Sequence, residues 1–123
     1  MKLLLDTHVF LWWEAKDSHL PETFVAAIES PKNEVFVSAA TVWEIAIKRS
    51  IGKLKFAGSA HNAVIRHGFQ HLAITSVHAE WAGSMPELHR DPFDRMLIAQ
   101  AKHEDLVLVT TDELILRYPV PHL

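Results

Sequence analysis

Short apolar runs alternate with segments of helical periodicity along the whole chain. Uninterrupted apolar residues predict strands at 3–5, 35–37, 72–74 and 106–109. Apolar residues that recur every three or four positions predict helices over 7–15, 21–28, 39–50, 60–67, 77–85 and 92–103. The tail around Tyr118 is expected to form a short edge element. No repeat or linker divides the 123 residues, so we expect one domain over 1–123.

Strands that alternate with helices predict a parallel sheet with helices on both faces. The predicted strands are apolar at every position, as burial of both sides of a sheet requires. We therefore expect an α/β fold. In such folds ligands bind beyond the carboxyl ends of the strands.

Acidic residues follow three of these strands. Asp6 comes directly after the first strand, and Asp112 comes shortly after the last. Glu44 lies early in the helix that follows the second strand. Because the strands are predicted to be parallel, all three carboxylates should project toward the same edge of the sheet.

A fourth acid lies on the apolar side of its helix. Asp94 precedes, by three, four and seven positions, the apolar residues Leu97, Ile98 and Ala101. Residues at these spacings share one face of a helix, so Asp94 should point inward rather than into solvent.

The helix predicted over 39–50 is apolar around most of its circumference, and we expect it to be largely buried. Its one narrow polar stripe is formed by Thr41, Glu44 and Lys48. That stripe should face a cleft or solvent.

Each acid also has a purely structural interpretation, because carboxylates near helix N-termini cap the helix or offset its dipole. Thr41 and Glu44 have the spacing of a capping box, and Glu44 and Lys48 have that of an ion pair. Asp91 precedes Pro92, a pattern typical of a cap, and we interpret Asp91 as one.

Converging carboxylates repel one another, and burial would leave some of them protonated unless a cation is present. The chain has no cysteine, so thiolate metal sites and disulfides are excluded. Oxygen ligands favour Mg²⁺ or Mn²⁺. Because the net charge is −3, we expect such an ion to mediate contact with a phosphate.

Four segments of the chain resemble the motifs of a known family. They are LDTH (5–8), SAATVWEIAIK (38–48), HRDPFDRMLIAQA (89–101) and VTTD (109–112). In order and spacing they look like the motifs of PIN-domain nucleases, above all the VapC-like toxins of type II toxin–antitoxin pairs. Asp6, Glu44 and Asp94 match the acidic core of that family, and Asp112 matches its more variable fourth acid.

The resemblance implies a PIN-like three-layer α/β/α sandwich and cleavage of RNA with Mg²⁺ or Mn²⁺. It also implies a homodimer and a cognate antitoxin as partner. We hypothesise that the acids position a metal that activates water to attack a phosphodiester. Thr7, Thr110 and Thr111 could orient carboxylates or water. Candidate contacts to the RNA backbone, which could equally be solvated helix ends, are Lys48, Arg49, Arg90 and Arg95.

Other functions are compatible with parts of this pattern. A phosphatase or receiver-like domain also places aspartates at sheet ends, but usually with a second acid close in sequence. Asp6 is followed by Thr7 and His8 instead. A non-catalytic binding domain, in which the acids are caps, and a PIN-like module for housekeeping RNA processing stay open.

Three further features complete the interpretation. The apolar run over 9–13, with Trp12 and Trp13, cannot face one core. Either this helix is wholly buried or, as we expect, one tryptophan lies at an interface. His67 and His71 have a metal-ligand spacing, but Gly68 weakens the helix and no nearby acid completes a site. The N-terminal apolar run is too short for a signal or membrane segment, and the lack of cysteine fits the reducing cytoplasm that we expect as its location.

Overall fold

The computed structural model describes all 123 residues. Its strands are β1 (Lys2–Leu5), β2 (Glu34–Ser38), β3 (Gln70–Leu72) and β4 (Val107–Val109). Its helices are α1 (Thr7–Ala15), α2 (Glu22–Glu29), α3 (Ala39–Ser50), α4 (Ala60–Arg66), α5 (Ser76–Ser84), α6 (Pro92–His103) and the 3-10 turn η1 (Ile115–Arg117). None of the helices has both the length and the apolar character needed to cross a bilayer.

The four strands form one parallel sheet in the order β3-β2-β1-β4. β1 lies at the centre, where Leu3 pairs with Val35 of β2 on one side and with Val107 of β4 on the other. Because all strands run in the same direction, their carboxyl ends meet at one edge of the sheet. The predicted parallel α/β fold is confirmed.

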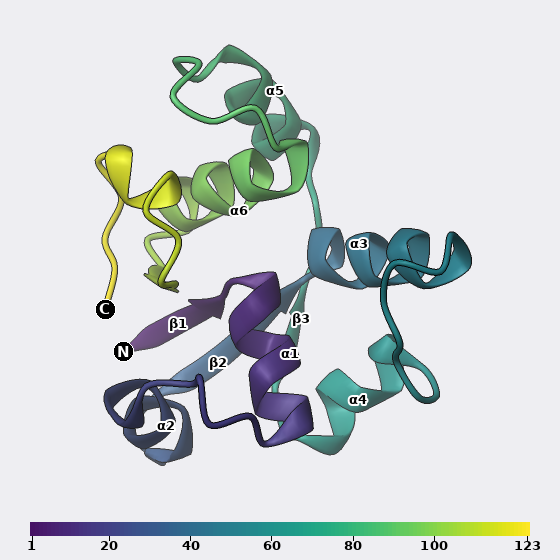
Figure 1. The fold of residues 1–123 in the computed structure, drawn as a ribbon. Coiled ribbons are helices and arrows are strands. Elements are labelled where there is room, and N and C mark those ends of the chain that lie inside the picture. Colours follow the sequence, from purple (N-terminus) through teal and green to yellow (C-terminus); the bar gives the residue numbers. More distant parts are fainter.

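Helices cover both faces of this sheet (Figure 1). Successive strand residues point to opposite faces. Leu3 and Leu5 accordingly pack in one core with residues of α1, α2 and α4, whereas Leu4 packs in a second core with residues of α6 and the C-terminal segment. The result is the three-layer α/β/α arrangement that was predicted.

The C-terminal segment returns along β4 as an edge element, as predicted. The N–H of Leu108 donates to the carbonyl of Pro121 at 2.8 Å, and the N–H of Leu123 donates to the carbonyl of Leu108 at 3.2 Å. His122 forms an isolated parallel bridge with Leu108. This segment therefore covers the outer edge of β4.

The element boundaries lie within one residue of the prediction except at β3, and two of the differences have a structural reason. The third strand lies two residues earlier than expected, because the buried side chain here is Phe69, just before β3, while Ala73 and Ile74 are exposed. Pro21 precedes α2 as its N-cap instead of occupying its first turn.

α3 is less buried than its composition predicts. Trp43 is 60% exposed, and Ala39 and Ala46 are exposed on neighbouring turns. Thr41 and Glu44, the residues of the predicted polar stripe, are instead buried. The expectation of a largely buried apolar helix is therefore wrong: α3 directs polar side chains inward, at the edge of the sheet, and an indole outward.

Candidate metal centre

The central strand places Asp6 at the carboxyl edge of the sheet. Asp6 directly follows β1 and caps α1, since its Oδ1 accepts the N–H of His8 at 2.9 Å. Its Oδ2 accepts a hydrogen bond from the hydroxyl of Thr110, just after β4, at 2.6 Å. Asp6 is only 3% exposed. The first turn of α1 and the residue after β4 thus hold one oxygen each of this buried carboxylate.

Two more acids and a histidine meet beside Asp6. Oδ2 of Asp94, in the first turn of α6, lies 2.7 Å from Nε2 of His89. The ligand-type atoms of His89, Asp94 and Asp112 all lie within 4.8 Å of one another. The charge of Asp6 acts on Asp94, and the charge of Asp112 acts on Asp6. The structure therefore brings Asp6, Asp94 and Asp112 together.

Glu44 approaches the same edge from α3. Thr7, next to Asp6 in sequence, and Thr41, one helical turn before Glu44, share a buried hydrogen bond of 3.0 Å between their hydroxyls. Glu44 is 3% exposed, and its Oε2 accepts a hydrogen bond from Nζ of Lys48 at 2.6 Å. Its Oε1 is buried without any hydrogen-bond partner.

Burial raises the pKa of two of these carboxyls. For Asp94 the loss of solvent is the main cause, and the negative charges of Asp91 and Asp6 add to it. The pKa of Asp94 rises to about 7, although the hydrogen bond from His89 opposes the shift. Burial also raises the pKa of Asp6, against its two hydrogen bonds. The cluster thus lacks a nearby positive charge strong enough to keep all of its carboxylates ionised at neutral pH.

This donor set fits a hard divalent cation. The donors are carboxylate oxygens with one imidazole beside them, and Mg²⁺ and Mn²⁺ prefer oxygen ligands. A cation here would favour the ionised form of Asp94 and would offer a partner to the unpaired Oε1 of Glu44.

Capping accounts for part of the acidic pattern. Asp91 accepts two backbone N–H groups of the first turn of α6, at 2.9 and 3.1 Å, and is the cap that was predicted. Asp112 uses Oδ1 in the same way before η1, at 2.8 Å. The alternative capping box of Thr41 and Glu44 is absent, because Ser38 caps α3. The alternative ion pair of Glu44 with Lys48 is present.

Only some of the threonine and arginine side chains that were predicted to support the site lie within it. Thr7 and Thr110 are buried and hydrogen-bonded within it, whereas Thr111 is exposed. The side chain of Arg49 donates to carbonyls of the loop after α3. Arg90 is exposed and lines a surface hollow beside His89.

Arg95 holds the segment that precedes α6. Its guanidinium donates, at 2.8–3.2 Å, to the backbone carbonyls of Ala82, Met85, Pro86 and His89. Its donors are therefore directed at the protein's own backbone. We interpret Arg95 as a structural residue rather than a contact to RNA.

We expect Arg95→Ala to lower the free energy of unfolding by about 2 kcal/mol, because it removes charged hydrogen bonds and leaves partly buried carbonyls unpaired. Arg90→Ala is the matched control, since this exposed side chain should change stability by less than about 0.5 kcal/mol. Urea unfolding of both variants measures the difference. Equal stability would contradict the structural role of Arg95.

His89 is the residue of this site that sequence analysis missed. It lies in a loop, five residues before Asp94, so no helical or strand periodicity relates the two. The only signal is its position at the start of the motif-like segment 89–101, two residues before the cap Asp91.

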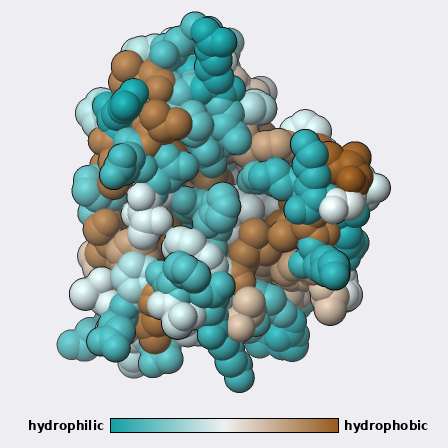
Figure 2. All heavy atoms as spheres, viewed as in Figure 1, coloured by the Kyte–Doolittle hydropathy of each residue, from teal (hydrophilic) through white to brown (hydrophobic).

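Away from the acids, α1 leaves both of its tryptophans partly exposed. Trp12 lines an apolar hollow together with Leu54 and Phe56, from the loop between α3 and α4. Figure 2 shows apolar surface in a hollow on this side of the molecule, below the projecting end of α3. The expected interface at a tryptophan stays a prediction.

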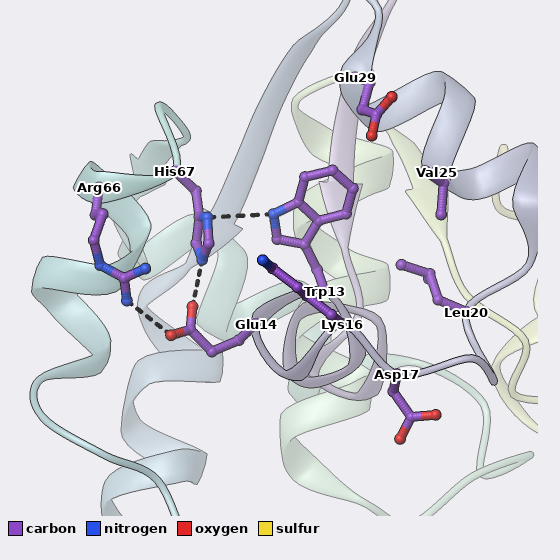
Figure 3. Close-up of a pocket in the computed structure, with 9 residues that line it drawn as sticks. All are labelled: Trp13, Glu14, Lys16, Asp17, Leu20, Val25, Glu29, Arg66 and His67. Carbon is purple, nitrogen blue, oxygen red and sulfur yellow. Dashed lines mark hydrogen bonds and ion pairs between the residues drawn. The ribbon is translucent and has the colours of Figure 1, made fainter.

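Trp13 lines a cavity of about 460 Å³ between α1, α2 and α4 (Figure 3). Its indole donates to Nδ1 of His67 at 3.4 Å, and the other ring nitrogen of His67 contacts Glu14, which also pairs with Arg66. His71 lies on β3 and joins no metal-ligand cluster with His67. The two histidines therefore have separate partners, since His71 contacts the carbonyl of His61.

Comparisons with known proteins agree with this architecture. The family profile described as PIN domain matches residues 3–121. Among solved structures, VapBC2 from Rickettsia felis bound to a DNA fragment from its promoter aligns at 17% identity with a TM-score of 0.66, covering 100% of this chain and 98% of that one. DNA-bound VapBC from Salmonella typhimurium aligns at 19% identity with a TM-score of 0.65, covering 100% and 97%.

A toxin–antitoxin complex from Klebsiella pneumoniae aligns at 18% identity with a TM-score of 0.62, covering 89% of this chain and 86% of that one. At such identities the likeness shows a shared fold. A search of curated proteins found no match to this sequence.

Proposed function

Because the chain belongs to the PIN-domain family, we propose that it is a Mg²⁺- or Mn²⁺-dependent endoribonuclease. The observation that carries this proposal is the convergence of Asp6, Asp94 and Asp112 at one edge of the sheet, together with the buried Glu44, whose partner Lys48 also feels the charge of Asp94. Buried acids gathered in this way are costly for a protein without a bound cation. Capping alone does not require that cost.

Asp6, Glu44, Asp94 and Asp112 would hold the cation. When bound, a divalent ion lowers the pKa of a coordinated water and stabilises negative charge on a phosphate. Thr110 keeps Asp6 oriented through its 2.6 Å hydrogen bond, and Thr7 and Thr41 fix the start of α1 against α3.

The reaction is hydrolysis of an RNA phosphodiester. The oxygen of an attacking water forms a new bond to phosphorus, and the bond from phosphorus to the 3′ oxygen breaks. The products are a 3′-hydroxyl and a 5′-phosphate. We assign a contact with the RNA backbone to Arg90, which is exposed beside His89, and not to Arg95, which is engaged with the protein's own carbonyls.

The biological setting that we propose is a toxin–antitoxin pair, with this chain as the toxin and as a homodimer. The similar fold from Klebsiella pneumoniae is a toxin–antitoxin complex, which supports the proposal. Protein partners bury apolar surface, and the hollow beside Trp12 offers such a surface on α1. We propose that the antitoxin or the second subunit covers it.

The purified chain should cleave RNA with Mg²⁺ or Mn²⁺, lose this activity in EDTA and regain it when the metal is restored. Gel analysis with a 5′-phosphate-dependent exonuclease checks both cleavage and the product ends. In cells, the wild type expressed alone should arrest growth. Cleavage that persists unchanged in EDTA would contradict the metal mechanism, and harmless expression of the active chain would contradict the toxin role.

A further inference from the structure

His89 lies against the acidic cluster, but the mechanism above gives it no role. Its Nε2 lies 2.7 Å from Oδ2 of Asp94, and its side chain is 12% exposed. When Asp94 is ionised, as a metal ligand must be, the imidazole N–H donates in this hydrogen bond and the carboxylate accepts. Oδ1 of Asp94 makes no hydrogen bond and is left for another partner.

The fold fixes the backbone of His89 on both sides. The hydroxyl of Tyr118, from the C-terminal segment, accepts the N–H of His89 at 2.9 Å. Nη1 of Arg95, from α6, donates to the carbonyl of His89 at 3.1 Å. Tyr118 is 4% exposed and also donates to the carbonyl of Pro86 at 2.7 Å.

These contacts separate His89 from an ordinary loop residue. Residues in loops without regular structure usually move more than the elements around them. Here two side chains from distant parts of the sequence hold the loop so that its imidazole lies against Asp94. Such an arrangement lets His89 fix the orientation of a carboxylate.

We propose that His89 is a positioning residue for the metal centre. By holding Oδ2 of Asp94, it orients the carboxylate and leaves Oδ1 free to bind the cation. Hydrogen bonds of this kind orient metal ligands, and their loss typically costs about 10–100-fold in metal affinity. This inference rests on the proposed function, because it requires a cation at the acids.

The test is Mn²⁺ binding by the full chain, titrated by electron paramagnetic resonance. His89→Ala should weaken Mn²⁺ binding by about 10–100-fold. His89→Gln should recover most of the affinity, since its amide can donate an N–H to Asp94 from a similar distance. His19→Ala is the matched control: it removes a histidine–aspartate hydrogen bond of the same 2.7 Å length, to Asp17 beyond α1, and should bind Mn²⁺ as the wild type does.

The outcomes distinguish the role of His89 from the existence of the metal centre. Equal affinity of the wild type and His89→Ala would overturn the role of His89 and leave the metal centre intact. Failure of the wild type to bind Mn²⁺ would overturn the proposed function and this inference with it. Spectral coupling of Mn²⁺ to a directly bound imidazole nitrogen, present in the wild type and lost in His89→Ala, would make His89 a ligand and overturn the positioning role.

The substitutions leave the backbone bonds of residue 89 in place, and urea unfolding without metal verifies the fold of each variant. If His89→Ala unfolds, His89→Leu takes its place in the comparison, because leucine has a similar size but offers no donor to Asp94. Weak binding by folded His89→Gln, equal to that of His89→Ala, would also overturn the role assigned to the hydrogen bond.

Discussion

Asp94→Asn should reduce RNA cleavage by more than about a hundredfold and yet make the metal-free protein more stable than the wild type at pH 8. Asparagine keeps an oxygen that accepts the hydrogen bond from His89, but it lacks the charge that binds a cation. Charge stabilisation by a metal is worth several kcal/mol in the transition state, and each 1.36 kcal/mol is about tenfold in rate. Most substitutions of partly buried residues destabilise, so the opposite sign would mark a functional carboxylate.

The gain in stability follows from the raised pKa of Asp94. This carboxyl has a model value of 3.8 and a folded-state pKa of about 7. Between these values the folded state holds more protons than the unfolded state, so the free energy of unfolding falls as the pH rises. The contribution of the group is fully present below about pH 4 and is lost by about pH 7. This contribution to the free energy of unfolding amounts to roughly 4 kcal/mol. Asp94→Asn does not lose stability in this way, because asparagine does not ionise.

Urea unfolding in EDTA at pH 5 and pH 8 measures this effect, and the advantage of Asp94→Asn should grow between the two. A cleavage assay at pH 8 with Mg²⁺ gives the accompanying loss of activity. Near wild-type cleavage by Asp94→Asn would remove Asp94 from the mechanism. A variant less stable than the wild type at pH 8 would show that the carboxylate serves the fold.

Mg²⁺ or Mn²⁺ at a hundred times its dissociation constant should raise the melting temperature of the wild type by about 10 °C. A ligand that binds only the folded state adds about 2.7 kcal/mol at that concentration. In a domain of this size, 1 kcal/mol corresponds to a shift of about 3–5 °C. Asp6→Asn should respond much less, because it removes a charge at the centre of the cluster while asparagine can still cap α1.

Asp105→Asn is the matched control for this thermal shift. Asp105 is exposed, precedes the amino end of β4 and has a positive φ of 55°, a conformation that asparagine also tolerates. Its response to the metal should equal that of the wild type. Equal responses of Asp6→Asn and Asp105→Asn would show that the ion binds elsewhere on the surface.

The convergence of the acids could be predicted because local patterns determine it. Asp6 and Asp112 each follow an apolar strand, and parallel strands end at the same edge. Asp94 lies on the apolar stripe of its helix, whose inward face could be read from the spacing of Leu97 and Ile98. These inferences require only the periodicity of one element at a time.

The rest depends on contacts between elements, which no local pattern encodes. His89 is held by Arg95 and by Tyr118, the latter 29 residues away in sequence. The number of apolar residues in α3 alone favours burial of the Trp43 indole. Trp43 is exposed instead, because α3 turns Glu44 toward the edge of the sheet. Long-range packing thus decides which face of α3 and which conformation of the loop before α6 the fold adopts.

The hydrogen bond between Thr110 and Asp6 joins residues 104 positions apart. During translation, β1 and its aspartate therefore emerge long before β4 can pair with them. A nascent chain attached to the ribosome has no complete acidic centre until its last strand is made. A cation that requires all four carboxylates can therefore bind only after β4 has paired with β1.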